Sequence, residues 1–404
     1  MQRPTSSTTG AAGSLLRVSL TVRPITAAEH LAFIEKQPSV SFLQTPSWAR
    51  VKTEWRSESV GWFDSLQGGA LVGAALVLHR PVPKLERFTL AYLPEGPSID
   101  WSGDLAPWLE PLATYLKKNH AFGIRIGPPV TTATWSAAQV KDGIADDTVQ
   151  RLNQLTPTHR DATGARVVSQ LRAAGWRLQS PEDGFGAGQP QYNFVIPLAH
   201  EDGTPKTEDE VLKGMNQLWR RNIKKAAKMG VEVTVATPVD PADGDFEGDL
   251  SAFHDLYVHT AARDHFTPRQ RSYFSTMFWA MSTEDPERIK LFLARHEGDL
   301  VAATIMVRVG QYAWYSYGAS STEKRDVRGS NALQWAMIQD AMAAGATTYD
   351  LRGITPTLST DDSHVGLIQF KVGTGGQAVE YAGEWDLPLN KPIYTAFDVY
   401  MKRR

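Results

Sequence analysis

The sequence contains no cysteine. This absence excludes a thiol nucleophile, an acyl-cysteine intermediate, disulfide bonds and cysteine-ligated metals. The 404 residues also carry no large excess of charge, because 42 Lys and Arg oppose 44 Asp and Glu and leave a net charge of −2. Binding to a nucleic acid would therefore depend on a local basic patch and not on the charge of the whole protein.

Long hydrophobic runs are missing as well. No stretch approaches the ~20 apolar residues that span a bilayer. Residues 1–18 are rich in Ser, Thr and Gly and lack the apolar core of a signal peptide, so we predict a disordered N-terminus. We expect a cytoplasmic protein, with peripheral contact at the inner face of the cell membrane as an open alternative.

What the sequence does contain is a repeated pattern, and its length favours two domains. Each half shows a glycine turn followed by an apolar strand, then a strand with aromatic residues, a helical pattern and a short buried strand. Two copies of one β-β-β-α-β unit predict an α/β protein with a mixed sheet covered by helices in each half. From the hairpin's second strand onward, the elements lie at residues 69–78, 88–93, 105–118 and 122–129, and again at 298–307, 312–320, 331–344 and 348–355.

The two copies are separated by residues 131–190, which are rich in Ala, Thr, Gln, Asp and Gly. We predict two short helices there, around 146–154 and 164–175, followed by a linker at 184–191 and a strand at 192–198. The predicted division of the chain is a disordered N-terminus at 1–18, a first domain at 19–188 that the C-terminal residues 380–404 complete, and a second domain at 189–379.

This order of elements resembles the GNAT acyltransferase fold, so two tandem GNAT-like domains are expected. Members that use coenzyme A carry Gln/Arg-x-x-Gly-x-Gly/Ala before the central helix, where backbone N–H groups bind pyrophosphate. The corresponding stretch at 326–331 reads Asp-Val-Arg-Gly-Ser-Asn and keeps only the central glycine. We therefore expect no coenzyme A and no other cofactor.

The C-terminal stretch LIQFKVGTGGQAVEYAGEWDLPLNKPIYTAF at 367–397 is the most specific signal. It is not a Walker phosphate loop, because its lysine precedes the glycines. Phe370-Lys371 and the residues that follow closely resemble the C-terminal signature of the Fem family, the FemA/FemB/FemX peptidoglycan bridge aminoacyltransferases. Shorter matches are FLQTPSWARVKTEW at 42–55, LPEGP at 93–97, WRRNIKKAAKMGVEV at 219–233 and DHFTPRQRSYF at 264–274.

The sequence departs from that family in two places. Some members carry an Asp-Pro after the buried strand of the first domain, where this chain has Ile126-Gly127-Pro128. Only residues from about 234 to 250 are free for the long helical arm of FemA-type members. The resemblance is therefore to the armless FemX branch.

The resemblance implies transfer of a small amino acid from aminoacyl-tRNA to the stem-peptide amine of UDP-MurNAc-pentapeptide or lipid II. Glycine is our first expectation, with alanine and serine as alternatives. The donor is already an activated ester, so the enzyme has to position two large substrates and stabilise the developing oxyanion. A monomer is expected.

The resemblance also implies site residues. Lys371 and Phe370 are expected where the tRNA end meets the acceptor, with Phe370 stacking on a base. Lys52 and Arg269 are expected to hold the diphosphate of the precursor. Tyr273 lies one helical turn after Arg269 and should face the same groove. Tyr315 and Tyr317 alternate in a strand and should share a face, from which one contacts the sugar or the peptide.

A basic stripe at helical spacing has two interpretations. It consists of Arg220, Arg221, Lys224, Lys225 and Lys228. Cations near a helix C-terminus are favoured by the helix dipole alone. In a chain of net charge −2, such a concentration also suggests contact with tRNA phosphates, which is our prediction.

Other functions stay open at this stage. No metal site is expected, because the spacing of His254 and His259 does not fit the HExxH pattern. The alternatives within enzymes are a coenzyme A-dependent N-acyltransferase and an aminoacyl-tRNA-dependent transferase that acts on a secondary metabolite or a lipid. The alternative of another class is a non-catalytic module that binds tRNA or the precursor.

Overall fold

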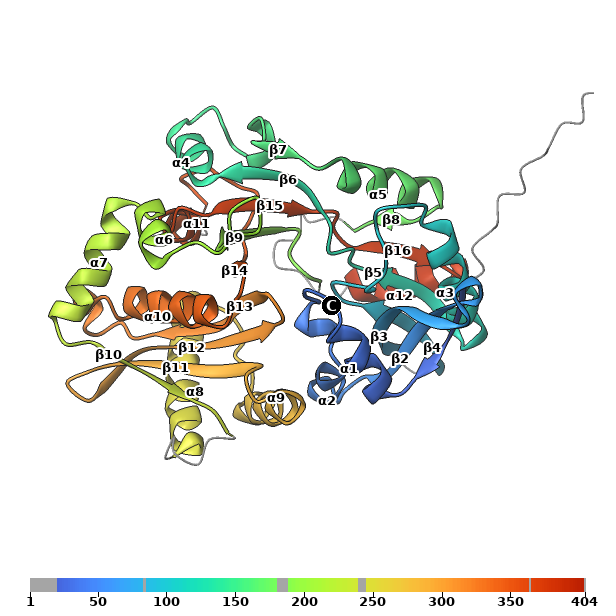
Figure 1. Ribbon diagram of the computed structural model, residues 1–404, viewed down its shortest axis with the longest axis horizontal. Coiled ribbons are helices and arrows are strands. Elements are labelled where there is room, and N and C mark those ends of the chain that lie inside the picture. Colours follow the sequence, from blue (N-terminus) through green and yellow to red (C-terminus); the bar gives the residue numbers. More distant parts are fainter. Residues whose placement is uncertain (1–19, 83–84, 180–187, 239–244, 363–364, 403–404) are drawn as a thin grey trace, which may run out of the picture.

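Figure 1 shows the computed structural model of the protein, in which two β-sheets lie side by side with helices on their faces. The structure describes residues 20–82, 85–179, 188–238, 245–362 and 365–402. The predicted disordered segment 1–18 lies outside these ranges, and so do the first four residues of the predicted linker at 184–191.

The first sheet has seven strands in the order β1-β2-β3-β4-β5-β16-β8. Neighbouring strands are antiparallel except β4 and β5, which run parallel and are connected through helix α3 (Ala106–Lys118). The strands are β1 (Leu20–Ile25), β2 (Arg56–Asp64), β3 (Ala70–Val82), β4 (Leu85–Leu93), β5 (Ala121–Ile126), β16 (Trp385–Pro388) and β8 (Arg177–Leu178).

The second sheet has nine strands in the order β10-β11-β12-β13-β14-β9-β15-β6-β7. Among its described strands, β13 and β14 are the one parallel pair, connected through helix α10 (Gly329–Ala343). The strands are β10 (Glu232–Ala236), β11 (Ile289–His296), β12 (Asp299–Val309), β13 (Tyr312–Ser320), β14 (Thr348–Gly353), β9 (Tyr192–Pro197), β15 (Gln377–Tyr381), β6 (Thr131–Ser136) and β7 (His159–Arg160).

The two sheets confirm the predicted repeat of a β-β-β-α-β unit. β2, β3, β4, α3 and β5 have the same order and strand directions as β11, β12, β13, α10 and β14. Most of β3 and β12 is apolar because both faces of each strand are covered. The hairpin turns use Gly68 and Gly298 at φ angles of 66° and 87°, which residues with a Cβ rarely adopt.

Helices cover both faces of each sheet. On the first sheet, α3 and α5 (Ala162–Ala173) pack on one face. α1 (Ala27–Ile34), α2 (Pro46–Val51) and α12 (Lys391–Lys402) pack on the other. On the second sheet, α8 (Phe246–Asp264) and α9 (Arg271–Glu284) cover one face. The opposite face carries α10 with α4 (Ala137–Ala145), α6 (Glu208–Gly214), α7 (Gln217–Lys228) and α11 (Val365–Val372).

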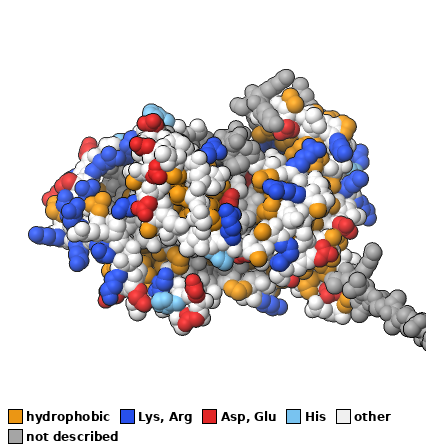
Figure 2. Space-filling view, turned by 90° about the horizontal axis from the view of Figure 1, so that it is seen from above, with side chains coloured by type: hydrophobic (Ala, Val, Ile, Leu, Met, Phe, Trp, Pro, Cys, Tyr) orange, Lys and Arg blue, Asp and Glu red, His pale blue; other side chains and the backbone are white. Residues whose placement is uncertain are grey.

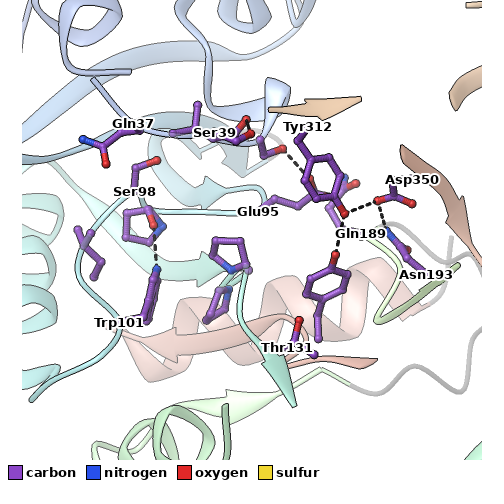
Figure 3. Close-up of a pocket in the computed structure, with 18 of the residues that line it drawn as sticks. Gln37, Ser39, Glu95, Ser98, Trp101, Thr131, Gln189, Asn193, Tyr312 and Asp350 are labelled. Carbon is purple, nitrogen blue, oxygen red and sulfur yellow. Dashed lines mark hydrogen bonds between the residues drawn. The ribbon is translucent and has the colours of Figure 1, made fainter. Parts of the chain in front are cut away.

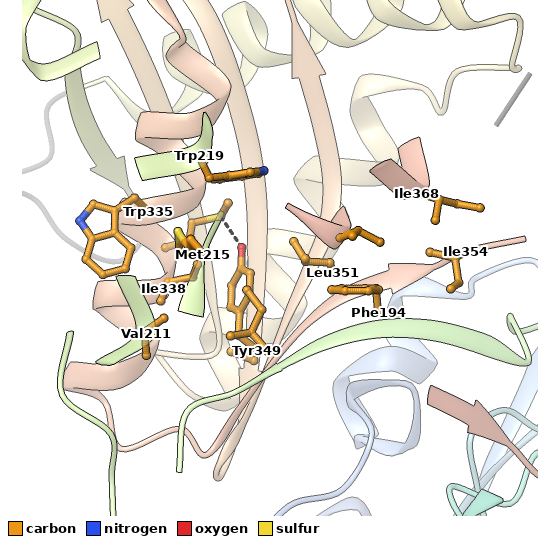
Figure 4. Close-up of a cluster of buried hydrophobic side chains, with 14 of the residues drawn as sticks. Phe194, Val211, Met215, Trp219, Trp335, Ile338, Tyr349, Leu351, Ile354 and Ile368 are labelled. Atoms are coloured by element: carbon orange, nitrogen blue, oxygen red, sulfur yellow. Dashed lines mark hydrogen bonds between the residues drawn. The ribbon is translucent and has the colours of Figure 1, made fainter. Parts of the chain in front are cut away.

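The core under α10 contains large side chains from β9 and α7, together with others from β14 and α11 later in the chain. Figure 4 shows Phe194, Tyr349, Leu351 and Ile368 in the same cluster as Trp219. α10 is hydrophobic on most of its surface, as expected of a buried helix. α8 packs against β11, β12 and β13, and α9 packs against β11 and α8. Among the described residues, these two helices therefore belong to the body of the second sheet and do not form a projecting arm.

One predicted helix is misplaced. The helix expected around 146–154 lies earlier, as α4, because Ser136 and Gln139 form a capping box that starts it. Only a short 3-10 turn, Leu152–Gln154, falls in the expected range. The helix expected around 164–175 is confirmed as α5, which Asp161 caps.

The chain crosses between the sheets more than once. β6, from the segment that the predicted division assigns to the first domain, pairs with β15 in the second sheet. β16 follows β15 directly in the chain and pairs with β5 in the first sheet. No helix among the described residues is long and apolar enough to cross a membrane.

Candidate active site

A cavity of about 540 Å³ lies where the two sheets meet. Figure 3 shows that side chains from both halves of the chain converge on it, with Glu95 and Trp101 from the first half and Asn193, Tyr312 and Asp350 from the second. The loop that follows β4, the starts of β9 and β13, the end of β14 and the connection from β15 to β16 therefore form its walls.

Arg352, at the end of β14, is the one cation among the described residues that line the cavity. Its guanidinium donates to Glu95 Oε1 at 2.9 Å and to Gln189 Oε1 at 2.9 Å. The backbone of Arg352 has a φ of 63°, an unfavourable conformation for a residue with a side chain. It is held there because the Arg352 N–H donates to Asp350 Oδ1 at 2.6 Å. The local strain thus turns the guanidinium into the cavity.

Asp350 is buried beside Arg352. Its Oδ2 accepts hydrogen bonds from Asn193 Nδ2 at 2.9 Å and from the Tyr312 hydroxyl at 3.2 Å. The hydroxyls of Tyr312 and Tyr381 are 3.0 Å apart, which extends this network along the cavity wall. Burial raises the pKa of Asp350 above its usual value.

Glu384, between β15 and β16, is a second buried carboxylate in the cavity wall. Its Oε1 accepts a hydrogen bond from the Tyr92 hydroxyl at 2.5 Å. Burial raises the pKa of Glu384 to about 7, while Arg125 and the Tyr92 hydroxyl act in the opposite direction. Arg125 itself is bound to Asp386 through two hydrogen bonds of 2.7 and 2.9 Å.

Lys371, on α11, does not line the cavity but lies behind Arg352. Its ammonium donates to the carbonyl oxygens of Arg352 at 3.1 Å and of Gly353 at 2.7 Å. The residue is only 4% exposed, and burial lowers the pKa of its amine to about 7. Lys371 therefore fixes the end of β14, from which Arg352 enters the cavity.

Phe370 packs against α7. Its ring centroid is 4.8 Å from that of Trp219, and the Trp219 indole N–H donates to the Phe370 carbonyl at 2.9 Å. The Phe370 ring is thus in contact with a ring of the protein, at an interplanar angle of 52°. The predicted stacking of Phe370 on a tRNA base stays a prediction.

The structure brings four other predicted residues together at the junction of α2 and α9. The Lys52 ammonium lies 5.8 Å from the Tyr273 ring centroid, and the Arg269 guanidinium lies 5.1 Å from it. The hydroxyls of Tyr273 and Tyr317 are 3.2 Å apart. Burial lowers the pKa of Lys52, and Arg269 lowers it further, while Glu54 raises it. Two cations on one tyrosine are suited to an anion such as a diphosphate.

Tyr315 and Tyr317 do not share a face, so that prediction was wrong. Ile305 pairs with Tyr317 and Met306 with Tyr315, which leaves the intervening Ser316 as an extra residue in β13. Such a bulge reverses the alternation of side chains. Tyr317 therefore joins Tyr273 beside α8 and α9, whereas Tyr315 packs into the core under α10.

The basic stripe lies on α7. Arg220 is already used within the protein, because it donates to the carbonyl oxygens of Lys213 and Met215 at 3.0 and 2.9 Å. No ion pair with a described carboxylate involves the other four cations of the stripe. Figure 2 shows Lys and Arg side chains gathered at the end of the molecule where α7 lies in Figure 1.

The charged residues that line the cavity were not predicted from the sequence. Asp350 and Arg352 are charged residues in a strand expected to be buried, and that conflict was an available signal. Glu95 stands inside the LPEGP motif, which carried no role. Glu384 had no local signal, because its burial comes from β4 and from the segment at 188–190.

Comparison with known proteins gives a consistent result. The sequence matches the FemAB family over residues 25–296 and 280–402. It is 25% identical to the lipid II:glycine glycyltransferase of Staphylococcus saprophyticus. The alignment is 437 residues long, gaps included, and covers 92% of this chain and 93% of that protein. The enzyme of the same name from Staphylococcus aureus strain MRSA252 is also 25% identical, over 442 residues and with the same coverage. Among solved structures, a crystal structure of FemX superimposes with a TM-score of 0.74 at 23% identity, covering 93% of this chain and 99% of that chain.

Proposed function

Because the chain belongs to the FemAB family, we propose that it is an acyltransferase that transfers glycine from glycyl-tRNA to a stem-peptide amine of lipid II. The product is the start of a peptidoglycan interpeptide bridge. The observation that carries the proposal is the match to two lipid II:glycine glycyltransferases over 92% of this chain. The reaction exchanges an activated ester for an amide, so no cofactor is required.

The cluster of Lys52, Arg269, Tyr273 and Tyr317 supports an acceptor that carries a diphosphate. Lys52 is a compact charge on a half-buried stem, and Arg269 can bind a phosphate through two parallel hydrogen bonds. The two tyrosine hydroxyls add neutral donors beside them. A diphosphate between a sugar and a lipid, as in lipid II, would be held here while the peptide reaches the cavity. A lipid-linked acceptor also implies peripheral contact of the protein with the membrane surface.

We propose that the remaining stripe of α7 contacts tRNA. Arg221, Lys224, Lys225 and Lys228 make no ion pair with a described carboxylate and lie on one helix next to Phe370 and α11. Lys371 then contributes by positioning Arg352 through the two carbonyl oxygens that it binds. Since both carbonyls lie at the end of β14, replacing this lysine would disturb the cavity wall.

The test is transfer of radiolabelled glycine from charged tRNA to lipid II. Parallel reactions use UDP-MurNAc-pentapeptide as acceptor, alanyl- and seryl-tRNA as donors, acetyl-coenzyme A as donor, and ribonuclease pretreatment. Label that enters the muropeptide and is abolished by ribonuclease supports the proposal and identifies the donor. Label that arrives from acetyl-coenzyme A and from no tRNA contradicts it.

A further inference from the structure

The cavity between the sheets has an excess of negative charge. Among its described lining residues, one guanidinium, that of Arg352, faces four carboxylates. The carboxylates are those of Glu95, Asp100, Asp350 and Glu384. A concave site with low-dielectric walls and one sign of charge attracts ligands of the opposite sign. The cavity is therefore suited to a cation.

Of the two buried carboxylates among the described lining residues, Glu384 has fewer hydrogen-bond partners than Asp350. Glu95 forms an ion pair with Arg352 at 2.9 Å, and Asp350 accepts three hydrogen bonds, including one from the Arg352 backbone. Glu384 makes no ion pair with a described residue. It is held by the Tyr92 hydroxyl and by the backbone N–H of Gln189.

The rest of the cavity wall combines polar side chains, such as Ser98, Thr131 and Gln189, with a larger aromatic and apolar surface. Trp101, Tyr312, Trp314 and Tyr381 line it together with Pro97 and Pro128. Such walls pack against a methylene chain, and ring faces also attract an ammonium group. A side chain with apolar methylenes and a terminal amine has both of the features that this lining would recognise.

We propose that this cavity takes the amine-bearing side chain of the acceptor and that Glu384 accepts the proton that its nitrogen must lose. The inference rests on the proposed function and names the group that activates the nucleophile. Arg125 and Asp386 lie behind Glu384, Tyr92 donates to it, and Arg352, Glu95 and Asp350 face the same cavity.

The proton balance of the step is complete. The bound ammonium gives one proton to the Glu384 carboxylate and becomes a neutral amine. Its lone pair attacks the ester carbonyl carbon of the aminoacyl-tRNA, so a C–N bond forms and the C–O bond to the ribose oxygen breaks. The second proton leaves the nitrogen and ends on the ribose hydroxyl, and Glu384 returns its proton to water.

The acid–base behaviour of Glu384 supports this role. Burial raises its pKa to about 7, close to the value that suits a general base at neutral pH. The carboxylate is ionised above that pH and accepts a proton, and below it the group is already protonated. The transfer rate of the wild-type protein should thus rise with pH through about 7.

The first experiment measures binding without tRNA. Calorimetry at pH 8 compares a stem pentapeptide whose third residue has a free side-chain amine with the same peptide acetylated on that amine. The wild-type protein should bind the free amine at least about tenfold more tightly, because one charge-assisted hydrogen bond is lost on acetylation. Glu384→Gln should lose most of this preference, because Glu95 and Asp350 are bound to partners within the protein. Wild-type binding that does not distinguish the peptides, or Glu384→Gln binding that keeps the wild-type preference, overturns the proposal.

Glu380→Gln is the matched control. Glu380 is also on the β15 side of the connection and also accepts a tyrosine hydroxyl, that of Tyr192 at 2.8 Å, but it does not line the cavity. This variant should distinguish the two peptides as the wild-type protein does. Loss of discrimination in Glu380→Gln would assign the effect to the fold and would contradict the proposal.

The second experiment follows transfer to lipid II against pH. Glu384→Gln should lower the maximal rate at least about 100-fold. Tyr92→Phe removes a hydrogen bond that lowers the pKa of Glu384, so the midpoint of the pH profile should move upward. An unchanged midpoint in Tyr92→Phe together with an active Glu384→Gln excludes this base.

The two experiments also separate this inference from the proposed function. If the wild-type protein distinguishes the peptides but transfers nothing from tRNA, the amine site is supported and the proposed reaction is wrong. If the wild-type protein transfers glycine but binds both peptides equally, the reaction is supported and the amine site is wrong.

Discussion

The Lys371 ammonium is an example of a side chain whose chemistry is set by its surroundings. It donates to two backbone carbonyl oxygens and forms no ion pair with a described carboxylate. A neutral amine still has two N–H groups, so both hydrogen bonds survive deprotonation. Burial therefore lowers the pKa of Lys371 without removing its contacts.

This depressed pKa predicts a pH dependence of stability. The pKa of Lys371 is about 7 in the folded protein against an ordinary value of 10.5. A lowered pKa means that the unfolded chain binds more protons between these values, so the contribution of Lys371 to stability increases with pH and is lost as pH falls through about 7. The free energy of unfolding of the wild-type protein should rise relative to that of Lys371→Met from pH 7 to pH 10.

Urea denaturation of both proteins at several pH values measures this difference. Lys371→Met also leaves two carbonyls without a donor, which costs about 1–3 kcal/mol at all pH values. A difference between the two proteins that stays constant from pH 7 to 10 would show that the amine titrates normally.

Among the helices, the start of α2 is hydrogen-bonded to the end of α9. Glu284, the last residue of α9, accepts from the Ser47 backbone N–H at 2.7 Å and from the Ser47 hydroxyl at 3.0 Å. It also pairs with Arg288, and both side chains are at least 95% buried. Because Lys52 is the C-cap of α2 and Tyr273 lies in the first turn of α9, this contact sets the spacing of the anion-binding cluster.

Glu284→Gln should therefore destabilise the protein by about 3–5 kcal/mol, since the buried Arg288 charge keeps only the longer ion pair with Asp285, at 3.4 Å. The KM for lipid II should increase as well. Glu287→Gln is the control, because Glu287 is exposed and its ion pair with Lys290 is worth about 1 kcal/mol or less. Urea denaturation and transfer kinetics of both variants test this prediction. Equal stabilities of the two variants would show that the contacts of Glu284 do not hold α2 and α9 together.

The helix α7 predicts a salt-dependent interaction. Neutralising Arg221, Lys224 and Lys228 together should weaken binding of charged tRNA and lower the slope of log affinity against log salt by about 0.7–0.9 per lost phosphate contact. Replacing Lys117 and Lys118, the exposed cations at the end of α3, is the control and should leave the slope unchanged. Fluorescence anisotropy with labelled tRNA measures both, and equal slopes in the two variants would remove α7 from the tRNA site.

At the scale of the whole molecule, one hydrophobic core connects the two sheets. Leu76 and Leu78 of the first sheet belong to the same buried cluster as Leu291 and Ile305 of the second, with α2, α8 and α9 between them. The C-terminal segment adds a second connection, because β15 and β16 are consecutive in the chain but lie in different sheets. The cavity is formed where these connections meet.

A chain that ends at residue 382 tests the role of this connection. It lacks β16 and α12, so β5 keeps β4 but loses its second partner strand, and Arg125 loses Asp386. Hydrogen exchange should become faster in β5 while β12 keeps its protection, because β12 is paired on both sides within the second sheet. Equal acceleration in both strands would show that the two sheets unfold as one unit.

Local patterns in the sequence were sufficient for the repeated unit and for the family resemblance. Hydrophobic periodicity and turn glycines act over a few residues, and so they located β3, α3, β12 and α10. The Phe370-Lys371 signature identified a family, and the comparison confirms it. Lys52, Arg269 and Tyr273 came from the shorter matches at 42–55 and 264–274, and the structure brings them together.

Only the tertiary structure decided how these residues face one another. The bulge at Ser316 separates Tyr315 from Tyr317, because the pairing of β12 with β13 and not the sequence of β13 determines the register. Burial of Lys371 and Glu384 depends on residues far away in the chain. The carboxylates of the cavity come from segments that no local pattern connects, since their proximity results from how two sheets pack and where the chain crosses between them.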